Sequence, residues 1–162
     1  MIQFLFPLRH LFSYACAVLS PLLSLLTTPL SALDGADEIL VFSYTAGFRH
    51  DSIPAAVSAI GGLGDAHGFV VHATEDRSVF NDEALAHYRA IVFLNTTGDI
   101  LDPDQEAAFE RFIQRGGGFV GIHAAADTEY EWTWYGRLVG AYFDSHPHIQ
   151  HAEIRVIDTV HP

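Results

Sequence analysis

The stretch LDPDQEAAFERFIQRGGGFVGIHA, residues 101–124, places a helix signal directly before a strand signal. Asp102 is a good N-cap, Pro103 suits the first helical position, and Gln105 completes a capping box. Three consecutive glycines end the helix, and the apolar run that follows them predicts a strand. A helix that leads into an apolar strand predicts part of a βαβ unit.

The same alternation of apolar strands and helical segments continues in both directions from this stretch. We predict strands at residues 38–44, 69–74, 90–97, 118–124 and 151–158, and helices at 53–68, 81–88, 102–115 and 132–140. This order predicts an α/β fold with a doubly wound, mainly parallel sheet of the flavodoxin-like type. The sequence stops just after the last predicted strand, so we expect a domain that is truncated at its carboxyl end.

The amino end has the composition of a targeting segment. Arg9 precedes a long apolar run, and Leu30-Ser31-Ala32 offers a small-residue cleavage site. We predict a signal peptide at residues 1–32, a domain at 33–162, and a secreted or periplasmic protein. An uncleaved membrane anchor and a mis-assigned start codon are the alternatives. The single cysteine, Cys16, lies inside this segment, so a mature chain would carry no thiol.

The charge of the chain bears on whether it binds nucleic acids. Its formal net charge is −12 at pH 7, and an acidic protein repels the phosphate backbone of nucleic acids. We therefore expect no nucleic-acid partner.

Polar residues follow three of the predicted strands. In a parallel sheet of this kind, ligands bind at the carboxyl ends of the strands. The candidates are Arg49 and His50 after the first strand, Thr96 and Thr97 after the third, and His123, Asp127, Glu129, Tyr130 and Trp132 after the fourth. We expect these groups to face one edge of the sheet.

Several segments carry a resemblance to a known family. They include TAGFRHDSIPA, VFLNTTGD, FERFIQRGGGFVGIHAAADTEYEW and the terminal DTVHP. From about Ile39 to Pro162 the sequence resembles the ThuA-like (trehalose utilisation) domain family, which shares the fold of class I glutamine amidotransferases. In true amidotransferases the corner after the fourth strand carries cysteine in a Gly-x-Cys-x-Gly pattern. Here the corner reads Gly121-Ile122-His123-Ala124-Ala125, so hydrolysis of glutamine through a cysteinyl thioester is excluded.

The resemblance implies a carbohydrate as the partner, and relatives are associated with oxidised, 3-keto sugars. A keto group acidifies the neighbouring C–H bond, so one placed base could start isomerisation or elimination. The expected catalytic residues are His123, Asp127 and Glu129, and the expected substrate contacts are Arg49, His50, Thr96, Thr97, Tyr130 and Trp132. The alternative is a non-catalytic sugar-binding domain, because a shared fold does not transfer an activity.

The sequence specifies no cofactor, and the one candidate is a divalent metal. Its predicted ligands are His50, His123 and His146, which would meet only through the fold. The same candidates have structural interpretations. His123 could hydrogen-bond backbone groups at a tight corner, and Asp127 or Glu129 could cap the next helix. The oligomeric state is left open.

Overall fold

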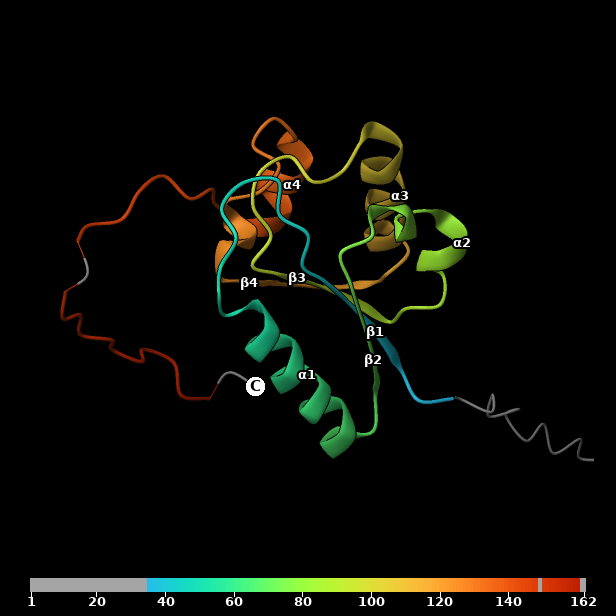
Figure 1. Ribbon diagram of the computed structural model, residues 1–162, viewed down its shortest axis with the longest axis horizontal. Coiled ribbons are helices and arrows are strands. Elements are labelled where there is room, and N and C mark those ends of the chain that lie inside the picture. Colours follow the sequence, from blue (N-terminus) through green and yellow to red (C-terminus); the bar gives the residue numbers. More distant parts are fainter. Residues whose placement is uncertain (1–34, 149, 161–162) are drawn as a thin grey trace, which may run out of the picture. The chain divides into compact units, whose positions relative to one another are not determined.

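The computed structural model describes residues 35–148 and 150–160 (Figure 1). Its sheet has four parallel strands in the order β2-β1-β3-β4. The strands are β1 (Glu38–Phe42), β2 (Val70–Thr74), β3 (Ala90–Leu94) and β4 (Gly118–Ile122). The predicted α/β fold with a parallel sheet is therefore confirmed.

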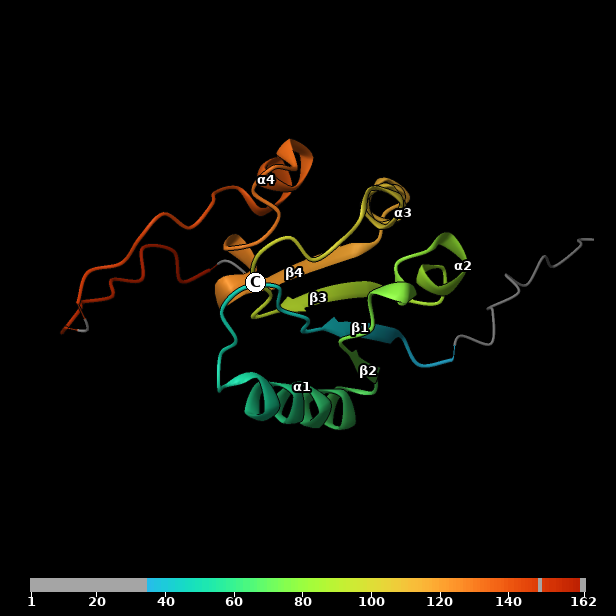
Figure 2. The same ribbon diagram turned by 45° about the horizontal axis from the view of Figure 1, so that its top comes forward.

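Helices cover both faces of this sheet. Figure 2 shows α1 (Ile53–His67) on one face, and α2 (Asp82–Leu85), α3 (Pro103–Gln114) and α4 (Thr133–Val139) on the other. The chain passes from β1 outward to β2, then returns to β3 on the opposite side of β1. The strand order thus reverses between β1 and β3, which is where doubly wound folds place their ligands.

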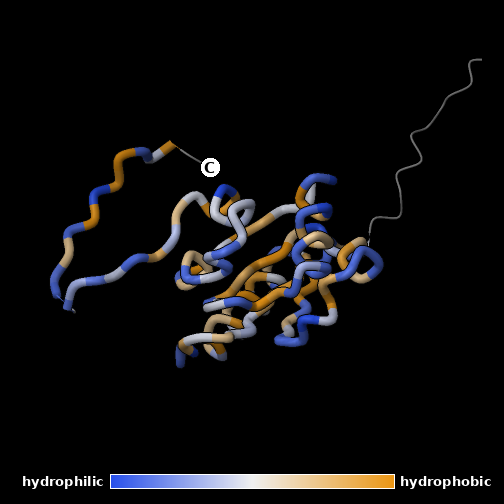
Figure 3. The backbone as a smooth tube through the Cα atoms, turned by 90° about the horizontal axis from the view of Figure 1, so that it is seen from above, coloured by the Kyte–Doolittle hydropathy of each residue, from blue (hydrophilic) through white to orange (hydrophobic). Residues whose placement is uncertain are grey.

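Side chains that alternate along the strands build two cores. Leu40 and Phe42 of β1, with Ile91 and Phe93 of β3, point towards α2, α3 and α4, and all four are buried. Val41, on the opposite face of β1, joins a smaller cluster against α1. Figure 3 shows apolar colour at the centre of the domain and again along the carboxyl-terminal segment. This burial holds the strand ends in place beneath the loops that carry the candidate site.

The local signals of α3 are confirmed in detail. The Asp102 side chain accepts hydrogen bonds from the backbone N–H groups of Asp104 and Gln105, and the Gln105 side chain accepts one from Asp102 N. Helix α1 differs. Ser52 occupies its N-cap position, but the Ser52 hydroxyl accepts a hydrogen bond from Asn95 Nδ2 at 2.8 Å and caps nothing.

One predicted strand is wrong. Residues 151–158 form neither a strand nor a helix, and Ile154 and Ile157 are 89% and 86% exposed. Alternating apolar residues become a strand only when a neighbouring strand satisfies their backbone groups. Among the described residues, β4 pairs with β3 alone.

The predicted signal peptide at residues 1–32 lies outside the described residues. In the part of the chain that the structure describes, no helix has the length and hydrophobicity needed to cross a membrane.

Candidate functional site

Three loops meet at the carboxyl edge of the sheet. The loop after β1 is joined to the loop after β3 by a bridge between Thr45 and Thr97, and the latter is joined to the loop after β4 by a bridge between Gly98 and Thr128. Backbone hydrogen bonds reinforce the second junction, from Gly98 N to the Asp127 carbonyl at 2.8 Å. The three loops therefore form one continuous floor.

Non-glycine residues in the left-handed backbone region concentrate in these loops. Asn95, His123 and Glu129 have φ values of 52°, 48° and 54°. Such conformations cost about 1–3 kcal/mol each and cluster at functional sites. The strain at His123 turns the chain sharply after β4, where a short 3-10 turn, His123–Ala126, begins.

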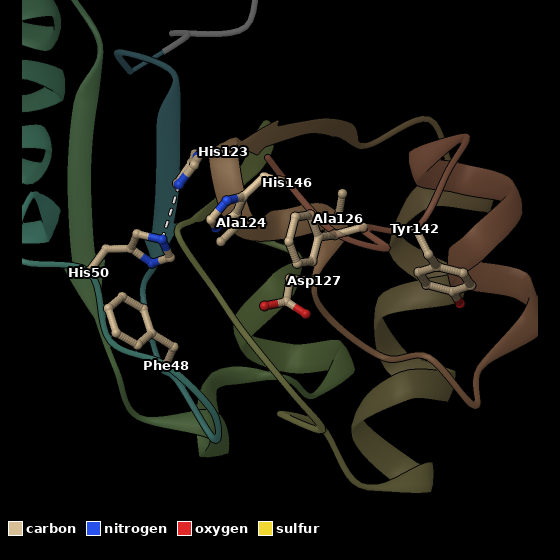
Figure 4. Close-up of a pocket in the computed structure, with 9 residues that line it drawn as sticks. Phe48, His50, His123, Ala124, Ala126, Asp127, Tyr142 and His146 are labelled. Carbon is tan, nitrogen blue, oxygen red and sulfur yellow. Dashed lines mark hydrogen bonds between the residues drawn. The ribbon is translucent and has the colours of Figure 1, made fainter. Parts of the chain in front are cut away.

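This turn brings His123 against His50 from the loop after β1. Their Nε2 atoms lie 3.0 Å apart, and their ring planes are nearly perpendicular, at 85° (Figure 4). Two ring nitrogens at this distance share one hydrogen, so one Nε2 donates and the other accepts.

One ring nitrogen of His50 stays unpaired in either direction of this bond. His50 Nδ1 is buried and has no hydrogen-bond partner among the described residues. A buried, unpaired nitrogen costs about 1–3 kcal/mol whether it is a donor or an acceptor, so the penalty at Nδ1 is similar in both arrangements.

The histidine pair lines a cavity of about 470 Å³, a volume within the usual range of ligand pockets, roughly 300–1,000 Å³. Its polar lining comes from His50, His123, Asp127 and His146, four of the residues predicted from the sequence. Its aromatic lining comes from Phe48, Tyr142 and Phe143. Figure 4 shows the Asp127 carboxylate and the two histidines around the same hollow.

Asp127 is held by a tyrosine from its own loop. Tyr130 Oη lies 2.6 Å from Asp127 Oδ1 and 2.9 Å from the Phe143 carbonyl oxygen, so its one proton has two acceptors. Partial burial and the hydrogen bond to Asp127 raise the pKa of Tyr130 to about 12. Tyr130, predicted as a substrate contact, is thus placed where it orients Asp127.

Glu129 is buried beside the cavity floor and does not line the cavity. Its Oε1 accepts hydrogen bonds from the backbone N–H groups of Ile100 and Leu101, both at 2.8 Å. Burial raises the pKa of the Glu129 carboxyl to about 7, and the negative charge of Asp99 adds to this, while the two N–H donors oppose it. The N-cap residue of α4 is Trp132, and no side-chain hydrogen bond caps this end of the helix. Asp127 and Glu129 therefore do not cap α4.

The remaining predicted contacts serve the scaffold. Arg49 forms a two-pronged ion pair with Glu75, at 2.7 and 3.2 Å. Thr96 and Thr97 are fully enclosed. The Thr96 hydroxyl lies 2.9 Å from that of Thr128, and the Thr97 hydroxyl donates to the Phe48 carbonyl at 2.8 Å. None of these three predicted contacts lines the cavity.

Trp132 also lies away from the cavity lining. Its ring stacks on Trp134, with centroids 5.0 Å apart, and packs against Phe109 of α3 and Tyr135 of α4. Its contacts are therefore those of a packing residue at a helix start.

Two of the three predicted metal ligands meet. His50 and His123 share the 3.0 Å contact, while His146 lines the same cavity with its Nδ1 2.9 Å from the Pro147 carbonyl oxygen. Zinc–nitrogen bonds of about 2.0–2.1 Å would join the two Nε2 atoms at an angle of roughly 95°. Within residues 35–148 and 150–160, no three His, Cys, Asp or Glu side chains gather closely enough to hold a metal ion. A metal at the three histidines stays a prediction.

The sequence interpretation missed the aromatic lining. Phe48 adjoins the noted Arg49-His50 pair, and its position after a strand was a usable signal. Tyr142 and Phe143 follow α4 and carry no comparable signal, because their place depends on how the chain returns from that helix.

Comparison with known proteins identifies the family of this chain. The family model described as "ThuA: Trehalose utilisation" matches residues 38–162. This chain belongs to the ThuA family. Among solved structures, a ThuA-like protein from Bacteroides uniformis is similar to it, with 27% sequence identity and a TM-score of 0.55. That match covers 69% of this ThuA-family chain and 47% of the relative, so the shared part is less than half of the relative's length. A search of curated proteins finds no match.

Proposed function

We propose that this ThuA-family protein is an enzyme that acts on an oxidised, 3-keto sugar by removing a proton next to the carbonyl. The observation that carries the proposal is the 3.0 Å contact between His50 and His123 in a cavity that also contains Asp127. Imidazoles and a carboxylate around one hollow are the groups that proton transfer requires. The family's description, trehalose utilisation, supports a carbohydrate substrate.

In this proposal His50 carries its proton on Nε2, and His123 carries its proton on Nδ1. When substrate separates the two rings, the His123 Nε2 lone pair accepts the proton from the carbon beside the keto group. The C–H electron pair moves onto the carbonyl oxygen as an enolate, and the N–H of His50 stabilises that oxygen. Asp127, oriented by Tyr130, faces the same hollow and holds the substrate hydroxyls. Glu129 supports this arrangement through the backbone of Ile100 and Leu101.

Amidotransferase chemistry is not proposed. The residue at the corner after β4 is His123, and the only cysteine of the chain is Cys16. We also propose that the protein works outside the cytoplasm, because the apolar segment at residues 1–32 fits a signal peptide. An uncleaved segment that anchors the protein to a membrane is the alternative.

The test is turnover of a 3-keto disaccharide and of its unoxidised parent by the full chain, with and without a chelator. We expect turnover of the keto sugar only, and a loss of about 10²–10⁴-fold in His123→Ala. His87→Ala, at an exposed position outside the cavity lining, is the control. Circular dichroism checks that each variant is folded. Unchanged turnover in His123→Ala would sink the assignment.

Two other outcomes are informative. Turnover that a chelator abolishes would favour a metal held by His50, His123 and His146. A folded protein that binds the keto sugar without converting it would favour the second candidate, a sugar-binding domain. The aromatic lining of the cavity is the observation that supports that candidate.

A further inference from the structure

We propose that Asn95 is a positioning residue, which fixes the separation of His50 and His123 by hydrogen bonds to the segment of each. This inference deepens the proposed function and rests on it, because the histidine pair is the centre of the proposed reaction. It depends on three features of Asn95: its two hydrogen bonds, its burial and its left-handed backbone.

The hydrogen bonds of Asn95 reach the segments that carry the two histidines. Its backbone N–H donates to the Ile122 carbonyl at 3.2 Å, and Ile122 directly precedes His123. Its side-chain Nδ2 donates to the Ser52 hydroxyl at 2.8 Å, and Ser52 follows His50 by two positions. One residue at the end of β3 is therefore bonded to a neighbour of each histidine.

The Ser52 end of this link is itself anchored. The Ser52 carbonyl accepts a hydrogen bond from Ala56 N at 2.9 Å, and the His50 carbonyl accepts one from Ile53 N at 3.3 Å. Both bonds tie the loop after β1 to the first turn of α1. The Ser52 hydroxyl caps no N–H group of this helix, so it is available to Asn95. A shift of Asn95 would therefore pass to His50 through a short, ordered stretch.

Asn95 is enclosed and has a strained backbone. It is 3% exposed, lies between the fully buried Leu94 and Thr96, and has a φ of 52°. Asparagine visits this left-handed region more readily than most residues, but glycine adopts it at no steric cost. The chain thus holds a buried amide where glycine would relieve the strain. Because a buried amide is costly without a partner, the bond to Ser52 stabilises the amide in this position.

The separation of the two rings matters for the chemistry of the pair. Their Nε2 atoms share a hydrogen at 3.0 Å, and such a bond is lost once the nitrogens move beyond about 3.5 Å. A displacement of about half an ångström in either loop would therefore break the contact. A misplacement of about 1 Å in a reacting group can lower a rate about 100-fold. Asn95 acts on the reaction only through this spacing, since it does not line the cavity.

The experiment measures the pair directly and requires no substrate. In the full chain with isotope-labelled histidine, NMR detects the shared hydrogen as a coupling between the two Nε2 nitrogens. We expect this coupling in the wild-type protein, and its loss in both Asn95→Gly and Ser52→Ala. Glycine keeps the left-handed turn and Ser52 is not a cap, so both variants should fold, which urea denaturation checks.

Turnover of the keto sugar adds a second measurement. Each variant should lower kcat about 10–100-fold with little change in KM, because the substrate contacts remain while the spacing of the rings changes. The double variant Asn95→Gly, Ser52→Ala should lower kcat no further than either single variant, because both remove the same hydrogen bond.

Asn81→Ala is the matched control. Asn81 is another loop asparagine, whose side chain donates to the Ser78 carbonyl at 2.8 Å and accepts from Ala84 N at 2.9 Å. It lies outside the cavity lining. Its loss should lower stability and leave the coupling between the histidines unchanged.

The outcomes separate this inference from the proposed reaction. Coupling that survives in either Asn95→Gly or Ser52→Ala would overturn the positioning role and leave the proposed reaction standing. A wild-type protein without the coupling, or an equal loss in Asn81→Ala, would also overturn the role. Loss of coupling in the two variants of a protein that converts no keto sugar would uphold the role and count against the proposed reaction alone.

Discussion

At the scale of single residues, Glu129 combines burial, charge and backbone strain. It is 3% exposed, has a left-handed backbone, and faces Asp99, Tyr135 and Tyr142 from the surrounding segments. Burial disfavours its charged form, so the folded protein holds the proton of Glu129 to a higher pH than the unfolded chain does.

This residue makes stability depend on pH. The folded pKa of Glu129 is raised from 4.5 to about 7, so the native state binds more protons than the unfolded state between these values. The free energy of unfolding should therefore fall as pH rises from about 4.5 to 7, by up to roughly 3 kcal/mol. Glu129→Gln should flatten this slope, as measured by urea denaturation at several pH values. The exposed Glu131→Gln should keep the slope, and an unchanged slope in Glu129→Gln would contradict the assignment.

Part of the candidate site was predictable because strand ends are recognisable in sequence. His50, His123 and Asp127 were placed at the carboxyl edge, and the structure brings all three to one cavity. The direct contact between the histidines was not predictable, since it depends on the backbone turn at His123. Thr97 looked like a ligand contact for the same positional reason, but its hydroxyl supports the neighbouring loop.

At the scale of elements, the junction of the loops after β1 and β3 depends on Gly98. Gly98 has φ +80°, and a Cβ atom there would lie 3.0 Å from Gly47 N and 3.2 Å from the Ala46 Cβ. Both neighbours belong to the loop that presents Phe48. The contact therefore couples two loops through backbone atoms that cannot move aside cheaply.

Gly98→Ala should lower the free energy of unfolding by about 1–3 kcal/mol, from the left-handed strain alone, and more through the contact with Gly47. Gly116→Ala is the matched control, because Gly116 has φ +94° but open space around it. The difference between the two variants, measured by chemical denaturation, isolates the contact between loops. Equal losses would show that the loops tolerate separation.

Most elements were predictable from local signals. The capping box and the glycines around α3 fixed its ends, and the apolar runs located all four strands. The predicted third strand extended to residue 97, whereas β3 ends at Leu94 because Asn95 adopts a left-handed backbone. Residues 151–158 were wrongly predicted as a strand. Their apolar residues alternate as in a strand, but among the described residues the segment pairs with no other strand.

At the scale of the whole molecule, the segment 150–160 adds exposed apolar surface without adding an element. Ile154, Val156, Ile157 and Val160 are all strongly exposed. A chain that ends at residue 148 should keep the melting temperature of the full chain and associate less at high concentration. Calorimetry and light scattering on both chains test this. A clear drop in melting temperature on truncation would show that the segment packs on the sheet.

The continuous floor of three joined loops has a kinetic consequence for ligand exchange. The floor is fixed by bridges and hydrogen bonds, and the facing side is tied to it, through Tyr142 Oη to the Glu129 carbonyl and through the Phe143 N–H to the Ala126 carbonyl. Entry and escape of a ligand should therefore require little rearrangement of the walls. The observed association rate should rise in proportion to ligand concentration, and variants of the lining should differ mainly in residence time.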